Sequence, residues 1–220
     1  MAGRIETIVE MEDRKLCAII RTDDEDQARQ AMRAAVAGGF RMIEFTLTTP
    51  GALELIEEFS RLDGADGKRL LVGAGTVLSR KDARQAVTAG ARFLASPVTD
   101  DEVIDEATEL DVPAIPGTAT PTEMFIAVEL GADIVKVFPA PHDIPTFVRQ
   151  IRGPLPELRI FPTAGVDEDN FLGILDAGAF GVGFVSSLFR PGELAAGDWG
   201  SIEARAERIH GRFREWNPEG

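Results

Sequence analysis

The chain has 220 residues, of which 44% are hydrophobic, and a formal net charge of -14. A chain of this length can bury one sizeable core, and its acidic balance argues against binding to nucleic acid or to anionic membranes. It has no apolar run of roughly 18 residues and no signal-like N-terminal stretch, so we expect a cytoplasmic protein with one domain over residues 1–220. The single cysteine, Cys17, lies in an apolar run and is expected in the core, which excludes an internal disulfide and a multi-cysteine metal site.

Short apolar runs rich in β-prone residues alternate along the chain with amphipathic segments of helical spacing. The expected strands cover residues 16–21, 42–47, 70–74, 93–96, 113–116, 134–138, 159–162 and 181–186. The expected helices cover residues 25–37, 52–61, 79–88, 100–110, 120–130, 144–151 and 167–177, with helical extensions at both ends, the C-terminal one over 201–216. Strands separated by helices pair in parallel, so eight such units predict a single-domain α/β fold, the (β/α)8 TIM barrel. A six-stranded flavodoxin-like sheet is the alternative.

Polar residues near the C-terminal ends of the expected strands are candidates for an active site, because these ends form the functional face of such a barrel. Arg21 ends the first strand and Glu44 lies in the second. Thr76, Pro97 and Thr163 stand at the ends of the third, fourth and seventh strands. We therefore expect these side chains to converge on one mouth.

Lys136 is a cationic residue in the apolar run 134–138, in a chain with few lysines. An ammonium among valine, isoleucine and phenylalanine is poorly solvated, which favours the neutral amine, the nucleophile that forms a Schiff base with a carbonyl. Strand alternation predicts that Lys136 and Glu44 both face the barrel interior, where they suit a nucleophile with an acid/base carboxylate. The competing interpretations are a lysine whose stem packs on apolar neighbours and a structural ion pair.

Six segments of the chain, in order, resemble those of the 2-keto-3-deoxy-6-phosphogluconate / 2-keto-4-hydroxyglutarate (KDPG/KHG) aldolases. They cover residues 39–50, 72–77, 95–97, 115–117, 136–140 and 161–166. Each is a weak signal alone, but six in register are specific. The resemblance implies a homotrimeric lyase of carbohydrate metabolism, of the Entner-Doudoroff type. It would cleave a 2-keto-3-deoxy-6-phospho sugar acid or 4-hydroxy-2-oxoglutarate to pyruvate and an aldehyde, glyceraldehyde 3-phosphate or glyoxylate, by a class I mechanism without metal or cofactor.

The resemblance also implies roles for individual residues. Lys136 matches the Schiff-base lysine and Glu44 the general acid/base. Arg21 resembles the arginine that binds the substrate carboxylate, a charge that some members supply at the position of Thr48. Thr76, Pro97 and Thr163 fall on positions that line the pocket of a small 2-oxo acid substrate.

The expected phosphate-binding residues are Ala164, Gly165, Gly183 and Ser186, acting through backbone N–H groups. Members that use phosphorylated substrates usually carry Thr-Gly-Gly at residues 163–165 and a glycine before the serine at residue 186, where this chain has Ala164 and Val185. The added side chains can crowd a phosphate, so 4-hydroxy-2-oxoglutarate or an unphosphorylated sugar acid is a competing substrate. Two other functions stay open: decarboxylation of a 3-oxo acid such as oxaloacetate, and a catalytically silent sugar-acid-binding barrel.

Overall fold

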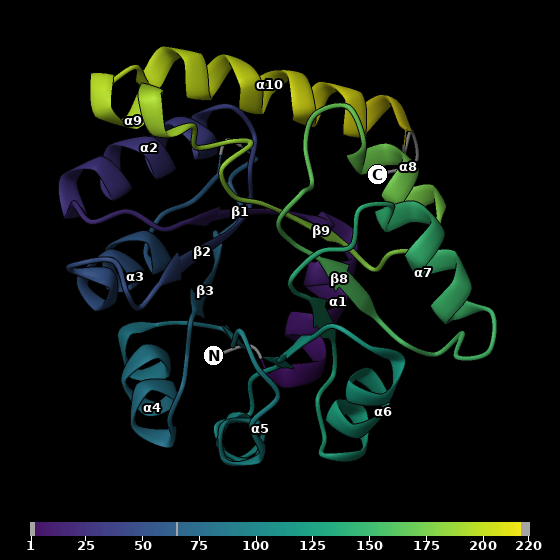
Figure 1. The fold of residues 1–220 in the computed structure, drawn as a ribbon. Helices are drawn as coiled ribbons and strands as arrows, with labels where there is room; N and C mark the ends of the chain where they lie inside the picture. Colours follow the sequence, from purple (N-terminus) through teal and green to yellow (C-terminus); the bar gives the residue numbers. More distant parts are fainter. Residues whose placement is uncertain (1–2, 65, 217–220) are drawn as a thin grey trace.

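The structure is a computed structural model that describes residues 3–64 and 66–216. Residues 1, 2 and 217–220, the two ends of the predicted domain, lie outside the described residues, as does residue 65. Helices form a ring around a curled layer of short strands (Figure 1). The strands and helices alternate as the sequence predicts, and the architecture is a TIM-barrel-like parallel α/β fold.

The strands form two sheets, of order β5-β4-β3-β2-β1-β9 and β6-β7-β8. All strand pairs in both sheets are parallel. The bounds are β1 Leu16–Ile20, β2 Met42–Thr46, β3 Leu71–Gly75, β4 Phe93–Ala95, β5 Ala114–Ile115, β6 Gly117–Thr118, β7 Val135–Val137, β8 Ile160–Pro162 and β9 Val182–Phe184. Strands β1 to β5 are neighbours in chain order, which argues against the flavodoxin-like alternative, because a doubly wound sheet reverses its strand order at a switch point.

The arrangement differs from the predicted single barrel of eight strands. The fifth expected strand, residues 113–116, is shorter in the structure, because β5 ends before Pro116, which lacks an N–H group to donate to a neighbouring strand. A further strand, β6, begins directly after Pro116, outside the expected range. One sheet ends at β5 and the other begins at β6. The observed architecture is thus a curled six-stranded sheet beside a three-stranded one.

The helices within the described ranges are α1 Arg4–Arg14, α2 Glu25–Ala37, α3 Ala52–Ser60, α4 Arg80–Ala89, α5 Asp101–Glu109, α6 Pro121–Glu129, α7 Ile144–Arg152, α8 Phe171–Asp176, α9 Pro191–Ala196 and α10 Trp199–Trp216. Side-chain caps begin several of them; for example, the side chain of Ser79 accepts from a backbone N–H in the first turn of α4, and Thr120 caps α6. Helix α9 was not predicted, although Pro191 and Gly197 mark its ends. None of the helices in the described part of the chain has the length and apolar character needed to span a membrane.

Side-chain alternation along the strands separates two buried layers. Within each strand, every second residue packs between the strand and the helices, as Ala18 does in β1 and Ile43 in β2. The residues that alternate with these, such as Cys17 and Met42, form an inner cluster that the curled sheet surrounds. Met11 of α1 belongs to this inner cluster, so α1 covers the end at which the strands begin (Figure 1). The opposite end, where the strands terminate, carries the predicted polar residues.

Candidate active site

Glu44 and Lys136 meet inside the curled sheet. Glu44 is the central residue of β2 and Lys136 the central residue of β7. The distance from Lys136 Nζ to Glu44 Oε1 is 3.8 Å, and 12% and 4% of the two side chains are exposed. Strand periodicity places both on the inner face, and the curl of the sheet brings together two residues that are far apart in the sequence.

The environment of Glu44 favours proton exchange. Burial raises the pKa of the Glu44 carboxyl, and the charge of Lys136 opposes that rise. Within the described part of the chain, Oε1 has no hydrogen-bond partner. A Cβ at Gly75 would overlap this oxygen, so the absence of a side chain there makes room for the carboxylate. A carboxyl group whose pKa is shifted toward neutrality, beside an amine, can act as an acid and as a base.

The thiol of Cys17 lies in the same inner layer. Burial raises the pKa of this thiol well above its ordinary value, and the Glu44 charge raises it further, while Lys136 lowers it. A thiol in these surroundings stays protonated and acts as a small apolar group. The prediction that Cys17 belongs to the core is therefore confirmed.

Arg21 follows β1 at the open end of the sheet and has an exposed side chain. It lines a cavity of about 340 Å³ together with Gln27, Ser186 and Pro191. Among residues 3–64 and 66–216, no carboxylate pairs with Arg21. Its guanidinium therefore remains able to bind a carboxylate or phosphate of a ligand.

Threonine hydroxyls connect the end of β2 to the residue that follows Arg21. Thr46 Oγ1 lies 3.1 Å from Thr48 Oγ1 and 3.2 Å from Thr49 Oγ1. The Thr49 hydroxyl accepts a hydrogen bond of 3.3 Å from the backbone N–H of Thr22. Sequence reasoning did not single out Thr49; the available signal was the cluster of threonines after the second strand.

The three expected pocket-lining residues all lie at the same open end. Thr163 directly follows β8 and is buried, and its Oγ1 has no partner within the described ranges. Thr76 follows β3 in a left-handed conformation with φ of 58°. Pro97 follows β4, and its carbonyl oxygen lies so close to Gly117 that a Cβ there would overlap it. The structure thus places polar and apolar groups from three strand ends around the mouth.

The expected phosphate-binding residues divide into two groups. Ala164, Gly165 and Ser186 line one cavity of about 190 Å³, which also includes Asp167. Gly183 does not line this cavity; it lies within β9 on the inner face, where a Cβ would crowd the side chains of its neighbours. Ala164 and Gly165 both have left-handed backbones, with φ of 51° and 72°. The chain turns sharply at these two residues, and Ala164 adopts a conformation that favours glycine.

Comparisons with known proteins agree with the resemblance found in the sequence. The family model for KDPG and KHG aldolase matches residues 7–205. A protein of Escherichia coli (strain K12) described as 2-dehydro-3-deoxy-6-phosphogalactonate aldolase is 32% identical over 179 residues, which are 81% of this chain and 86% of the relative.

Solved structures share the fold over almost the whole chain. The KDPG aldolase from Legionella pneumophila, with pyruvate captured as a covalent carbinolamine intermediate, has a TM-score of 0.80 and 26% identity, covering 92% of this chain and 97% of that one. A cube-shaped, highly porous protein cage, designed by fusing symmetric oligomeric domains, has a TM-score of 0.80 and 29% identity, covering 93% of this chain and 74% of that one. This chain belongs to the KDPG and KHG aldolase family.

Proposed function

We propose that this protein is a class I aldolase that cleaves a 4-hydroxy-2-oxo acid to pyruvate and an aldehyde. The observation that carries the proposal is the pair formed by Lys136 and Glu44, 3.8 Å apart and almost fully buried. The carbinolamine of pyruvate in the Legionella pneumophila relative supports the same chemistry in this chain. An amine beside a proton-exchanging carboxyl group is the minimum that imine formation requires.

The reaction follows from the chemistry of these two groups. The Lys136 ammonium passes a proton to Glu44, and the neutral amine that results attacks the C2 carbonyl. Glu44 then supplies and removes the protons needed to expel water, which leaves an iminium ion. Glu44, directly or through water, then takes the C4 hydroxyl proton. The C3–C4 bond breaks, the aldehyde leaves, and the electron pair is held as an enamine. Protonation of C3 and hydrolysis of the imine release pyruvate and restore the Lys136 amine.

We assign substrate recognition to the residues around the mouth. Arg21 binds the substrate carboxylate, and Thr76, Pro97 and Thr163 line the pocket. Because Ala164, Gly165 and Ser186 share a cavity beside the Arg21 cavity, we propose a 2-keto-3-deoxy-6-phospho sugar acid as the main substrate, with glyceraldehyde 3-phosphate as the aldehyde product. The name of the Escherichia coli relative supports a phosphorylated sugar acid. Gly183, in this proposal, keeps the inner face below the phosphate free of a side chain.

The proposal includes a closed eight-stranded barrel in which β5 and β6 count as one interrupted strand. The backbone N–H of Phe180 donates a 2.8 Å hydrogen bond to the carbonyl of Ile160, which supports continuity between β8 and the chain that enters β9. The only residue between β5 and β6 is Pro116. The cytoplasmic location and the absence of a metal or cofactor remain predictions from the sequence.

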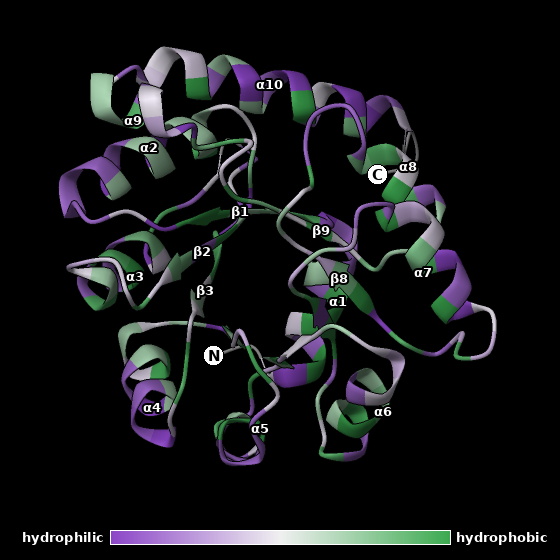
Figure 2. Cartoon of the chain, in the orientation of Figure 1, coloured by the Kyte–Doolittle hydropathy of each residue, from purple (hydrophilic) through white to green (hydrophobic). Residues whose placement is uncertain are grey.

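The proposal also includes a homotrimer. Helix α6 is partly hydrophobic (Figure 2), and the side chains of Phe125 and Ile126 within it and of Leu130 directly after it are exposed. Such a patch is typical of an interface between subunits, and the designed cage relative is described as containing symmetric oligomeric domains. Sedimentation at micromolar concentration should show a trimer for the wild type and smaller species for Phe125→Glu/Ile126→Glu. A monomeric wild type would contradict this part of the proposal.

Borohydride trapping with pyruvate tests the catalytic proposal directly. Reduction should leave a stable adduct, and peptide mapping should place it on Lys136. Lys136→Met should lose the adduct, whereas Lys81→Met, which removes an exposed lysine, should keep it. A well-folded wild type that forms no adduct would overturn the imine mechanism and favour a silent barrel.

Product analysis then shows which of the candidate substrates the enzyme prefers, and it tests the alternative that the protein is a decarboxylase. The enzyme should release pyruvate and glyceraldehyde 3-phosphate from the phosphorylated acid faster than it cleaves the unphosphorylated acid or 4-hydroxy-2-oxoglutarate. Turnover of oxaloacetate that releases carbon dioxide without any aldolase turnover would instead identify a decarboxylase.

A further inference from the structure

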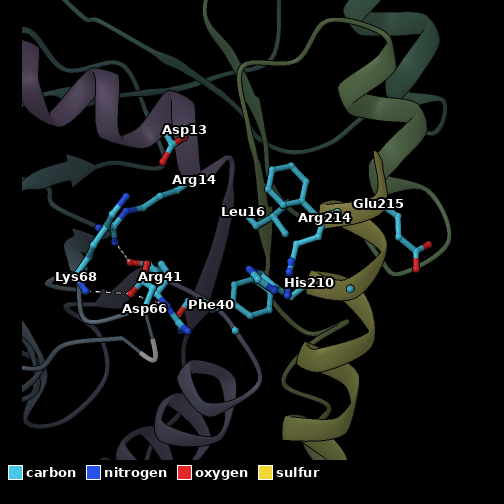
Figure 3. Close-up of a pocket in the computed structure, with 13 residues that line it drawn as sticks. Asp13, Arg14, Leu16, Phe40, Arg41, Asp66, Lys68, His210, Arg214 and Glu215 are labelled. Carbon is cyan, nitrogen blue, oxygen red and sulfur yellow. Dashed lines mark hydrogen bonds and ion pairs between the residues drawn. The ribbon is translucent and has the colours of Figure 1, made fainter. Parts of the chain in front are cut away.

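Another cavity lies at the opposite end of the strands from the mouth. It has a volume of about 790 Å³ and is bounded by the starts of β1 and β2, the loop before β3 and the last turns of α10 (Figure 3). Leu16 begins β1 and Arg41 directly precedes β2, whereas Arg21 and Thr46 mark the other ends of these strands. The cavity is therefore separate from the proposed active site, and its size falls within the roughly 300–1,000 Å³ of small-molecule sites.

Basic residues are concentrated around this cavity, although the whole chain has 37 acidic and 23 basic residues. Five cationic or titratable basic side chains line it: Arg14, Arg41, Lys68, His210 and Arg214. Three acidic residues accompany them: Asp13, Asp66 and Glu215. Without His210, four cations face three carboxylates, so the lining has a formal charge of +1 in a protein of net charge -14 and repels anions less than the chain as a whole does.

Two of the cations are already engaged and form the wall of the cavity. Arg14 donates to the backbone carbonyl of Arg41 and pairs with Glu10. Arg41 donates to the carbonyl of Phe40 at 2.9 Å and lies 3.3 Å from a carboxylate oxygen of Asp66. These contacts hold the guanidinium groups in place.

Lys68 and Arg214 are different, because both side chains are exposed and neither has an ion pair or side-chain hydrogen bond within the described ranges. They come from opposite walls, the loop before β3 and helix α10 (Figure 3). The side chain of His210 lies on the same wall as Arg214. Burial, and after it the charges of Arg41 and Arg214, lower the pKa of His210, while Asp66 raises it.

The cavity also offers apolar surface. Phe40 and Phe213 line it, and the ring of Phe213 is stacked on Trp216 with centroids 5.8 Å apart. Gly211 contributes open space, because a Cβ at this position would meet no heavy atom within 4 Å. Cationic heads beside aromatic rings suit a ligand with a phosphate at one end and an apolar or aromatic group at the other.

We propose that this cavity is a binding site for a small organic phosphate, held by Lys68 and Arg214 and packed against Phe213. The site is independent of the aldolase proposal, because it shares no residue with the mouth. A ligand here would touch residues that begin β1 and β2, the strands that carry Arg21 and Glu44 toward the other end.

The two histidines of the chain, His142 and His210, make the test direct, because their imidazole NMR signals can be followed without interference from others. Adenosine monophosphate, used as the probe at constant ionic strength, should shift the His210 signal saturably and leave the His142 signal in place. Adenosine at the same concentration should have a much smaller effect. An unsaturable His210 response, or an equal response to adenosine, would overturn the proposal.

Variants distinguish specific binding in this cavity from nonspecific attraction of the phosphate to positive charges elsewhere on the protein. Lys68→Gln/Arg214→Gln should weaken binding at least about tenfold, since two charge-assisted contacts are lost, while Lys81→Gln/Arg33→Gln removes the same kinds of charge outside the cavity and should bind as the wild type does. Gly211→Leu should block the cavity without removing a charge, and Gly211→Ala should leave binding intact. Unchanged binding by Gly211→Leu would refute the assignment to this cavity.

Discussion

Replacing Lys136 with methionine should make the stability of the protein strongly dependent on pH. In the wild type the ammonium lies 3.8 Å from Glu44 Oε1 and lowers the pKa of a carboxyl that burial raises. Methionine fills a similar volume but carries no charge, so the buried carboxylate loses its partner. The pKa of Glu44 should therefore rise further above its ordinary value of 4.5.

The sign and size of the effect follow from this geometry. When the folded pKa of a carboxyl exceeds its unfolded value, the unfolded chain releases its proton first, so stability falls as pH rises between the two values. Coulomb's law at an effective dielectric constant of about 20 gives an interaction of about 4 kcal/mol at this separation. At about 1.4 kcal/mol per pH unit, the loss should build up over roughly three pH units above the point at which Glu44 titrates in the wild type.

Urea unfolding at several pH values between about 5 and 8 measures this loss. The free energy of unfolding of Lys136→Met should diverge from that of the wild type as pH rises. The double variant Lys136→Met/Glu44→Gln should abolish the divergence, because glutamine does not titrate. If the free energies of unfolding of Lys136→Met and the wild type differ by the same amount at every pH in this range, the Lys136 charge does not affect the pKa of Glu44 and the electrostatic argument fails.

Three further changes test neighbouring parts of the site. Gly75→Ala should lower kcat at least about tenfold with little loss of stability, because the new methyl group displaces the Glu44 carboxylate; an unchanged kcat would show that the carboxylate position is not critical. Thr49→Val should raise KM for the 2-oxo acid more than it lowers kcat, because the backbone N–H of Thr22, the residue after Arg21, loses its partner, and Thr49→Ser should restore KM. Ala164→Gly should relieve a left-handed alanine and lower KM for the phosphorylated substrate but not the unphosphorylated one, with a stability change within about 1 kcal/mol.

Much of the fold could be predicted because its determinants are local. Alternation of apolar runs with helical spacing indicates strands and helices in turn, and only parallel pairing fits that order. The two-residue period of a strand likewise puts Lys136 on one face with Ile134 and Phe138, and Glu44 on one face with Met42 and Thr46. The resemblance to known aldolases then linked these two positions to one reaction.

The local signals were weaker where elements are short. Pro116 ends the fifth expected strand early, since it has no N–H to donate, and the two-residue strand β6 that follows it was not predicted. Helix α9 has few residues, so it lacks the repeated apolar spacing that marks the longer helices, and only its terminal Pro191 and Gly197 hinted at it.

Distances across the molecule were decided by the tertiary structure, because they depend on how the twist of every strand adds up to the curl of the sheet. The 3.8 Å between Lys136 and Glu44, and the link from Thr49 to the residue after Arg21, join segments whose separation no local pattern encodes. The same holds for the cavity between Lys68 and Arg214, whose walls come from a loop before β3 and from the last helix. The amino-acid sequence alone therefore determined which faces and chemical groups the strands present, and only the packing of the whole chain decided which of those groups meet.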